Sequence, residues 1–456
     1  MIIVGGGPAG IFAALELSRS TDLSVLLLEK GKDLHLRQCP IIGKERSCPP
    51  CSPCGLVSGW GGAGAFSDGK LTLSPRVGGQ LKDYLGADRT ADLINYVDEI
   101  YLKFGASNEI YGTGPEVDRV AQRAASAGLT LIPMPVRHMG TETCRDVLKE
   151  MHRFLDDRIE SRTDTAAVSI LVDDGAVKGI ETEDERQIES RYVIVAPGRE
   201  GADWLLGESG RLGLTLHNNP VDIGVRVEVP LAVLEDLTGV LHEVKLHFHT
   251  PTFDDRIRTF CMCPAGEVTM ETTGGSDQVI TVNGHSYSQR RTRNTNFALL
   301  VSADFTTPFR EPIAYGRHVA HLANLISSGV IVQRLGDLNE GHRSTFESIE
   351  EGAVKPTLKS ATPGDLAYVL PYRFLKDIIE MLTSMDQLAP GIASPDTLLY
   401  GVEVKFYSSR LELTDNLETE IPNMFAIGDG AGVSRGLIQA AASGVVVARE
   451  IVRRVS

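Results

Sequence analysis

The sequence lacks both an excess of positive charge and any long hydrophobic run. Its 60 acidic residues outnumber its 45 basic residues, so the formal net charge is −15 at pH 7. Nucleic acids and anionic membrane surfaces attract basic proteins, so this balance argues against both as partners. The apolar runs are also shorter than the roughly eighteen residues of a membrane-spanning helix. Composition therefore argues against a nucleic-acid partner and against a membrane-spanning segment.

Internal repeats and low-complexity segments are missing as well. The chain has 456 residues, of which 42% are hydrophobic, enough for two domains with their own cores. Its seven cysteines are an odd number, and the N-terminus has the pattern of a strand rather than of a signal peptide. We therefore expect reduced thiols or metal ligands and a cytoplasmic location.

The N-terminal segment has the pattern of a dinucleotide-binding unit. Residues 1–4 are apolar, as in a buried parallel strand, and residues 5–10 read G-x-G-x-x-G before a helical stretch. In this motif the first glycine permits a tight turn, the second admits a pyrophosphate, and the third lets helix and strand pack closely. The helix N-terminus offers N–H groups to the phosphates. The candidate binding residues here are Gly5, Gly7, Pro8, Ala9 and Gly10.

A second apolar strand, residues 23–28, ends in Glu29 and is followed by Lys30. An acidic residue at this distance from the glycines can accept hydrogen bonds from ribose hydroxyls. We expect both residues to contact the nucleotide. The fingerprint alone does not say which dinucleotide is bound.

The C-terminal region points to a flavin. An apolar strand, residues 424–427, closes in Gly428-Asp429 and resembles the second flavin signature of the glutathione-reductase superfamily. The resemblance implies that Asp429 holds the ribityl chain and that the next helix points its N-terminus at the flavin. Residues 192–198 are similar to a third signature, with Pro197 in place of the usual Thr. The resemblance makes FAD the expected cofactor and adds Gly198, Gly428, Asp429, Gly436, Leu437 and Ile438 to its candidate contacts.

A wider resemblance covers nearly the whole chain and includes a glycine-rich stretch, residues 58–71. It is to a family usually called uncharacterised FAD-dependent dehydrogenases. The resemblance implies that the glycine-rich loop lies along the flavin and that the backbone near Ala167 passes the adenine. The segments that carry it are residues 58–71, 282–287, 294–302, 397–407 and 436–437. The loop residues assigned to the cofactor are Gly61, Gly62, Ala63 and Gly64.

The order of patterns predicts an α/β fold. We expect an FAD-binding Rossmann-like domain, with three layers and a parallel sheet, interrupted by an inserted mixed β-sheet substrate domain. The sequence has no second G-x-G-x-x-G in the right context, so a nicotinamide donor or acceptor would share the substrate pocket. The predicted domains are 1–200 and 394–456 for the two parts of the FAD-binding domain and 201–393 for the substrate (cap) domain.

The catalytic candidates come from three places. Glu403, Lys405 and Tyr407 alternate with apolar residues, so one face of their strand is polar and is predicted to line the substrate side of the flavin. A solvent-facing strand would show the same pattern. His285 and Tyr287 in one turn, and Arg435 before the last helix, are further acid or base candidates. A hydrogen-bonded loop histidine and a surface or phosphate-pairing arginine are the alternatives.

Four cysteines lie between the nucleotide unit and the glycine-rich loop. Cys48, Cys51 and Cys54 form C-x-x-C-x-x-C, and Cys39 could add a fourth thiolate. This spacing suits a tetrahedral zinc or an iron–sulfur cluster. A disulfide or dithiol near the flavin, and plain thiols, are the other interpretations.

Together these patterns predict an FAD-dependent oxidoreductase that transfers hydride between the flavin and an unidentified small molecule. NADH or NADPH could serve as a transient donor or acceptor. The alternative is an electron-transfer flavoprotein or a flavoprotein that modifies RNA, although the acidic balance weighs against RNA.

Overall fold

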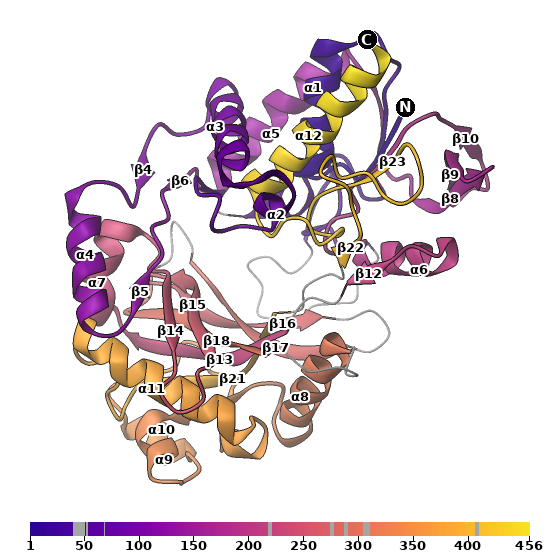
Figure 1. The fold of residues 1–456 in the computed structure, drawn as a ribbon. Helices are drawn as coiled ribbons and strands as arrows, with labels where there is room; N and C mark the ends of the chain where they lie inside the picture. Colours follow the sequence, from indigo (N-terminus) through magenta and orange to yellow (C-terminus); the bar gives the residue numbers. More distant parts are fainter. Residues whose placement is uncertain are drawn as a thin grey trace. The chain divides into compact units, whose positions relative to one another are not determined.

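The computed structural model describes residues 1–39, 51, 53–67, 69–217, 221–273, 278–286, 291–303, 311–405 and 410–456. The chain divides into two compact units (Figure 1). Unit 1 comprises Met1–Ile110, Pro135–His217 and Ser408–Ser456, and unit 2 comprises Tyr111–Met134 and Asn218–Tyr407.

Unit 1 is built on a parallel sheet of five strands in the order β23-β11-β1-β2-β7. Its three central strands are short, apolar and fully buried, as expected of strands covered on both faces. The strands are β1 (Ile2–Val4), β2 (Leu26–Leu28), β7 (Glu160–Arg162), β11 (Val193–Val195) and β23 (Met424–Ala426).

The first and last helices of the structure pack side by side in unit 1 (Figure 1). They are α1 (Pro8–Ser20) and α12 (Leu437–Val455). A Cβ on Gly444 of α12 would lie 2.1 Å from the carbonyl oxygen of Ala9 on α1. Only glycine at this position lets the two helices approach so closely.

Smaller elements complete unit 1. They form a β10-β9-β8 sheet, a β3-β6-β4 sheet, a β12-β22 pair and several helices. Their bounds are η1 (Gly62–Phe66), β3 (Lys70–Thr72), α2 (Leu81–Leu85), α3 (Ala87–Lys103), β4 (Ile110–Tyr111), β6 (Val136–His138), α5 (Thr141–Asp156), β8 (Ala167–Asp173), β9 (Ala176–Thr182), β10 (Gln187–Glu189), α6 (Ala202–Leu212), β12 (Leu216–His217) and β22 (Arg410–Leu411).

Unit 2 is built on a mixed sheet of eight strands in the order β20-β19-β21-β13-β18-β15-β14-β5. Most neighbours are antiparallel, and β19 and β20 are parallel. The strands are β5 (Thr130–Leu131), β13 (Val221–Pro230), β14 (Leu246–His249), β15 (Arg256–Cys263), β18 (Asn294–Ala303), β19 (Ile331–Arg334), β20 (Thr362–Pro363) and β21 (Leu398–Lys405).

The two faces of this sheet differ in character. Ile223, Val225 and Val227 of β13 belong to an apolar core, and α11 (Tyr372–Leu388) packs against β13, β15 and β18. A hairpin of β16 (Glu267–Thr273) and β17 (Val279–His285) packs against β13 and β21. The remaining elements are α4 (Pro115–Ser126), α7 (Leu231–Leu241), α8 (Pro312–Ile326), α9 (Leu335–Asn339), α10 (Phe346–Glu351) and η2 (Leu366–Tyr368).

The predicted fold class is confirmed: a Rossmann-like parallel sheet accompanies additional antiparallel sheets. The compact units divide the chain at other residues than the predicted boundaries. Residues 111–134 belong to unit 2 because β5 pairs with β14 and α4 contacts α7. Helix α6 belongs to unit 1, where Glu208 accepts a hydrogen bond from the backbone N of Ile170 on β8. Helices α7 and α11 were not expected in the β-rich region.

Asp377 on α11 is expected to make the stability of the protein depend on pH. Burial, and then the neighbouring Asp255 carboxylate, raise the pKa of Asp377 from 3.8 to about 7. The folded state therefore binds this proton more tightly than the unfolded state does. The resulting stabilisation is complete below about pH 4 and is lost as pH rises through 7.

Asp377→Asn should thus be more stable than the wild type at pH 9, by on the order of 2–4 kcal/mol, with the difference shrinking toward pH 4. Urea unfolding across this range measures the effect. Asp236→Asn, at an exposed position on α7, is the matched control and should leave the profile unchanged. Identical pH profiles for Asp377→Asn and the wild type would contradict the assignment.

Candidate functional site

The three glycines of the N-terminal turn have distinct geometries. Gly5 has φ +114°, and a Cβ there would lie 2.0 Å from the Ala196 carbonyl oxygen. A Cβ on Gly10 would lie 2.0 Å from the Gly5 carbonyl oxygen, so this position also requires glycine. Around Gly7 the nearest atom to a Cβ is the Gly62 Cα, at 3.9 Å. The space beside Gly7 and the N-terminus of α1 can therefore admit a ligand.

Glu29 joins this turn to the glycine-rich loop. Its carboxylate is buried and accepts hydrogen bonds from the backbone N of Gly6 at 2.8 Å, Gly31 at 2.8 Å and Gly59 at 2.9 Å. These donors fix the carboxylate, whose two oxygens retain further acceptor capacity. Lys30 lies 3.7 Å from Glu200, at the surface of the same region.

The glycine-rich loop lies directly against the turn. The backbone N of Gly61 donates to the Gly6 carbonyl at 2.8 Å, and a Cβ on Gly62 would lie 3.1 Å from the Gly7 Cα. A Cβ on Gly64 would lie 2.9 Å from the Leu437 side chain, at the start of α12. Ala63 lies within η1, between these contacts. The structure thus brings together residues from three separate parts of the predicted cofactor site.

Sequence reasoning missed Arg37, the side chain that holds this loop. Arg37 is 2% exposed, and its guanidinium lies over the Phe66 ring, 5.0 Å from the centroid. Burial lowers its pKa to about 10, so it stays charged at neutral pH. It donates to four well-placed backbone carbonyls: Gly55 at 3.1 Å, Leu56 at 2.9 Å, Trp60 at 2.6 Å and Gly62 at 2.8 Å.

The predicted ribityl contact, Asp429, lies at the edge of the same group. Its carboxylate accepts hydrogen bonds from the Ser434 hydroxyl at 2.6 Å and the Arg199 Nε at 3.1 Å. Gly428 has φ +78°, and its Cβ would lie 3.1 Å from the Ala9 Cβ. A Cβ on Gly430 would lie 2.3 Å from the Gly198 carbonyl oxygen, so Gly198 packs closely against the backbone that follows Asp429.

The sequence patterns also did not predict that residues 77–81 lie against the start of α12. The Arg435 backbone N donates to the Gly78 carbonyl at 2.9 Å. Gln439, which is fully buried, donates to the Val77 carbonyl at 2.9 Å and accepts from the Leu81 N at 3.3 Å. Ile438 is buried beside it, and the Arg435 side chain is half-buried.

Ala167 begins β8 next to this region. Two residues before it, the Thr165 backbone N donates to the Glu29 carbonyl oxygen at 3.0 Å. The backbone on which the predicted adenine contact stands is therefore joined to the strand that ends in Glu29.

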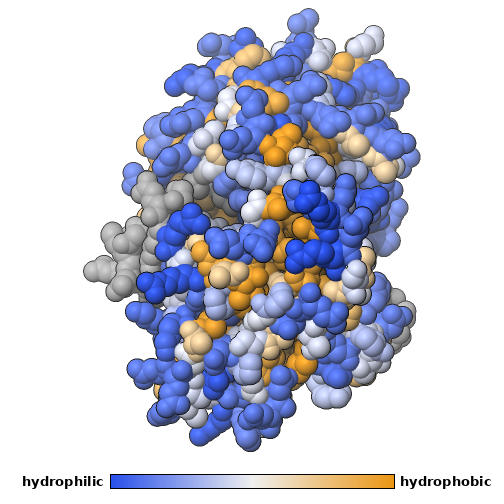
Figure 2. Space-filling model, turned by 90° about the vertical axis from the view of Figure 1, so that its left-hand side faces the viewer, coloured by the Kyte–Doolittle hydropathy of each residue, from blue (hydrophilic) through white to orange (hydrophobic). Residues whose placement is uncertain are grey.

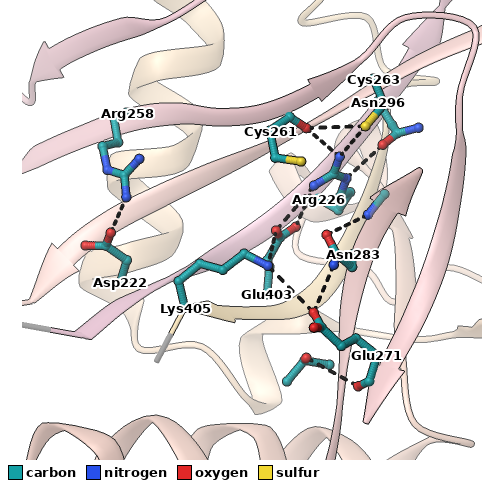
Figure 3. A network of polar contacts seen from close by, with 12 residues as sticks. Asp222, Arg226, Arg258, Cys261, Cys263, Glu271, Asn283, Asn296, Glu403 and Lys405 are labelled. Atoms are coloured by element: carbon teal, nitrogen blue, oxygen red, sulfur yellow. Dashed lines mark hydrogen bonds and ion pairs between the residues drawn. The ribbon is translucent and has the colours of Figure 1, made fainter. Parts of the chain in front are cut away.

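Unit 2 contains a buried polar network centred on Arg226 of β13 (Figure 3). The fully buried guanidinium lies 3.3 and 3.4 Å from the two carboxylate oxygens of Glu403. It also donates to Asn296 Oδ1 at 2.8 Å and to the Cys261 carbonyl at 2.6 Å. Lys405 Nζ lies 3.1 Å from Glu403 Oε1, so two cations share one carboxylate.

Glu403 and Lys405 thus lie on the polar face of β21, while Val402 and Val404 lie in the apolar core. A solvent-facing edge, the alternative explanation of this alternation, is wrong for Glu403, because it is fully buried and β21 lies between β19 and β13. Burial alone would lower the pKa of Lys405, but the Glu403 and Glu271 carboxylates raise it above the ordinary value. Lys405 is therefore a charged group at neutral pH.

The other catalytic candidates lie in different surroundings. His285 is exposed at the end of β17, in unit 2, and Arg435 is in unit 1. Tyr287 and Tyr407 lie outside the described residues.

The cysteine loop is described only in part, since Cys48 lies outside the described residues. Cys39, Cys51 and Cys54 are not in disulfides. Among the described residues, no three His, Cys, Asp or Glu side chains are grouped to hold a metal ion. The metal site at Cys39, Cys48, Cys51 and Cys54 therefore stays a prediction.

On the face shown in Figure 2, hydrophilic residues predominate. None of the helices in the described ranges is long and apolar enough to cross a bilayer.

Comparisons with known proteins indicate which class of protein this chain is similar to. Residues 220–406 match the family described as "FAD-dependent protein, C-terminal domain-like", and residues 3–37 match the "NAD(P)-binding Rossmann-like domain". A protein of Clostridium beijerinckii, described as an uncharacterized protein, is 27% identical, covering 99% of this chain and 80% of its own length. The matches and the turn geometry agree on an FAD-dependent oxidoreductase with FAD as its cofactor.

Two solved structures show a distant likeness. Glycine oxidase from Geobacillus kaustophilus is 13% identical with a TM-score of 0.39, over 99% of this chain and 94% of its own. The glycerol-3-phosphate dehydrogenase from Bacillus halodurans, solved in complex with FAD, is 10% identical with a TM-score of 0.38, over 99% of this chain and 64% of its own. Similarity at this level carries no argument about substrate.

Proposed function

We propose that this oxidoreductase transfers hydride between FAD and a small organic molecule, with the cofactor held by residues of unit 1. FAD, when bound, accepts or donates the hydride, and the protein supplies position and charge. The observation that carries the proposal is the convergence of the N-terminal turn, the glycine-rich loop and the start of α12 within unit 1.

The residues of unit 1 fit an extended dinucleotide. The open space beside Gly7 and the N–H groups of α1 suit a pyrophosphate, and Glu29 retains acceptor capacity for ribose hydroxyls. Asp429, held by Ser434, suits a ribityl hydroxyl, and Gly61 to Gly64 form backbone without bulky side chains. We also propose that the protein belongs to the glutathione-reductase-like superfamily, which the strands that resemble its flavin signatures support. We further propose a cytoplasmic location, which the free thiols support.

In unit 2 we assign Lys405 and Glu403 to the substrate side. Lys405 is held charged by Glu403, which is itself fixed by Arg226. A positioned ammonium can stabilise negative charge that develops on a substrate oxygen during hydride transfer, or hold a proton there. Glu403 acts through Lys405, as a positioning residue.

Anaerobic reduction of the bound flavin tests this function. We expect one of NADH, NADPH or a panel of small organic substrates to bleach the flavin of the purified protein. Lys405→Met should slow substrate-dependent bleaching by about tenfold to a hundredfold and leave the FAD content unchanged. Lys359→Met, at an exposed position of unit 2, is the matched control and should react like the wild type.

A flavin that no member of the panel reduces would contradict hydride transfer. Full-rate reduction of Lys405→Met would contradict the role of Lys405 alone.

A further inference from the structure

A second group of basic residues lies in unit 2, on strands β14 and β15 and at the residue before β14. The two strands pair antiparallel, with His247 opposite Arg258 and His249 opposite Arg256. We call Lys245, His247, His249, Arg256 and Arg258 the cationic face.

The alternation of side chains places the cationic face on one side of the sheet. Leu246 and Phe248 of β14 and Ile257 of β15 belong to the apolar core, so the residues between them point to the other side. Phe260 follows on β15, and three cations surround its ring. The distances to the ring centroid are 5.9 Å from Lys245, 4.8 Å from Arg258 and 5.9 Å from Lys405.

Among the described residues, Asp222 and Asp254 are acids that lie beside the cationic face. Arg258, 7% exposed, pairs with Asp222, whose other oxygen accepts from the Ser302 hydroxyl at 2.8 Å. The pair of His249 with Asp254 is long, 3.6 Å, and the Asp254 side chain is 94% exposed, so water screens it. Arg256 donates to the neutral Ser302 hydroxyl at 3.3 Å.

The positive charges of the cationic face affect the pKa of His247. Burial, and then the charges of Lys245, Arg256, Arg258 and His249, lower the pKa of His247 to about 4. The imidazole is therefore neutral at pH 7 and can donate one N–H to a ligand. Such a concentration of positive charge, in a chain of net charge −15, is typical of a site for an anion.

We propose that the cationic face binds a small organic carboxylate, with its charged group among Lys245, Arg256 and Arg258 and its apolar part against Phe260. A planar carboxylate suits the guanidinium of an arginine, and the aromatic ring favours an organic acid over an inorganic ion. This inference names the substrate class of the proposed function and rests on that function for the claim that the ligand is the substrate. The binding site itself does not depend on it.

Calorimetric titration of the purified holoprotein at low salt tests the site, with benzoate, its neutral analogue benzamide and inorganic phosphate as probes. We expect benzoate to bind at least about tenfold more tightly than either of the other two. Lys245→Gln with Arg256→Gln should weaken benzoate at least about tenfold and leave benzamide unchanged. Lys245→Arg, which keeps the charge, should retain binding, and Lys359→Gln is the control for charge removal elsewhere on unit 2.

Histidine NMR gives a second measurement. The pKa of His247 should rise from about 4 when benzoate is bound, and also in Lys245→Gln, because both reduce the positive field. An ordinary His247 pKa in the wild type would contradict the concentration of positive charge at the cationic face. Equal affinity for phosphate and benzoate would contradict the proposed preference for an organic carboxylate. A reducible flavin without carboxylate preference would contradict this site alone, whereas benzoate binding with an irreducible flavin would contradict only the proposed function.

Discussion

Replacing Gly7 with valine is expected to give a folded protein that has lost its FAD. Gly7 has φ −81°, which a valine readily adopts, and its Cβ would have the Gly62 Cα, at 3.9 Å, as nearest neighbour. The two added methyl groups would fill the space beside the N-terminus of α1, where we place the pyrophosphate. FAD affinity should fall at least about a hundredfold, on the order of 3 kcal/mol.

Flavin absorbance per mole of purified protein, followed by FAD titration, measures this loss. The melting temperature of Gly7→Val should match that of wild-type apoprotein. Gly207→Ala, on α6 with nothing within 4 Å, should keep its FAD. Gly10→Ala should instead destabilise the fold, because its Cβ would stand 2.0 Å from the Gly5 carbonyl oxygen. Stoichiometric FAD in Gly7→Val would refute our placement of the pyrophosphate.

Arg37→Met is the second substitution with a large expected effect. Methionine fills much of the same volume but leaves the loop carbonyls of Gly55, Leu56, Trp60 and Gly62 without their charged donor. An unsatisfied buried polar group costs roughly 1–3 kcal/mol, so we expect the loop to move and the apoprotein to lose a few kcal/mol of stability. FAD affinity should fall with it, because Gly61 to Gly64 leave their positions against the turn.

Urea unfolding of the apoprotein and FAD titration measure the two effects separately. Arg37→Lys should recover only part of each, since one ammonium cannot reach carbonyls that a planar guanidinium spans. Arg153→Met, whose side chain is 69% exposed, controls for the loss of an arginine from unit 1. Unchanged FAD affinity in Arg37→Met would show that the loop does not depend on this side chain.

The parts of unit 1 that could be predicted from sequence are those with a local signal. The turn at residues 5–10, the strands beside it and the Gly428-Asp429 end each combine a periodic apolar run with glycines at fixed spacing. Such patterns reflect backbone requirements within a few residues. Gly5, with φ +114°, has the geometry that the motif demands.

Arg37 and Gln439 could not be found in this way, because their partners are backbone groups of other segments. Arg37 donates to backbone carbonyls 18 to 25 residues later in the chain. Because every residue has such a carbonyl, the sequence does not indicate which ones an arginine will contact. Gln439 binds residues 77–81 from the opposite end of the chain. Their burial is a tertiary effect that local composition does not encode.

The same reasoning applies to unit 2. The alternation around Glu403 predicted a polar and an apolar face, and both are present on β21. Whether the polar face met solvent or other charges depended on Arg226, which is distant in sequence. The assignment of residues 111–134 to unit 2 depended likewise on the pairing of β5 with β14.

The packing of α1 against α12 has a consequence for how the protein is made. During synthesis β1 and α1 are translated before unit 2, whereas β23 and α12 are translated after all of it. At a translation rate of about 5–20 residues per second, α12 is synthesised on the order of tens of seconds after α1. The apolar surface of α1 lacks its contact with α12 during this time. Unit 2 can fold in this interval, while the sheet of unit 1 lacks its edge strand β23. Because the proposed cofactor site includes the start of α12, that site is complete only after α12 has been synthesised and has packed against α1.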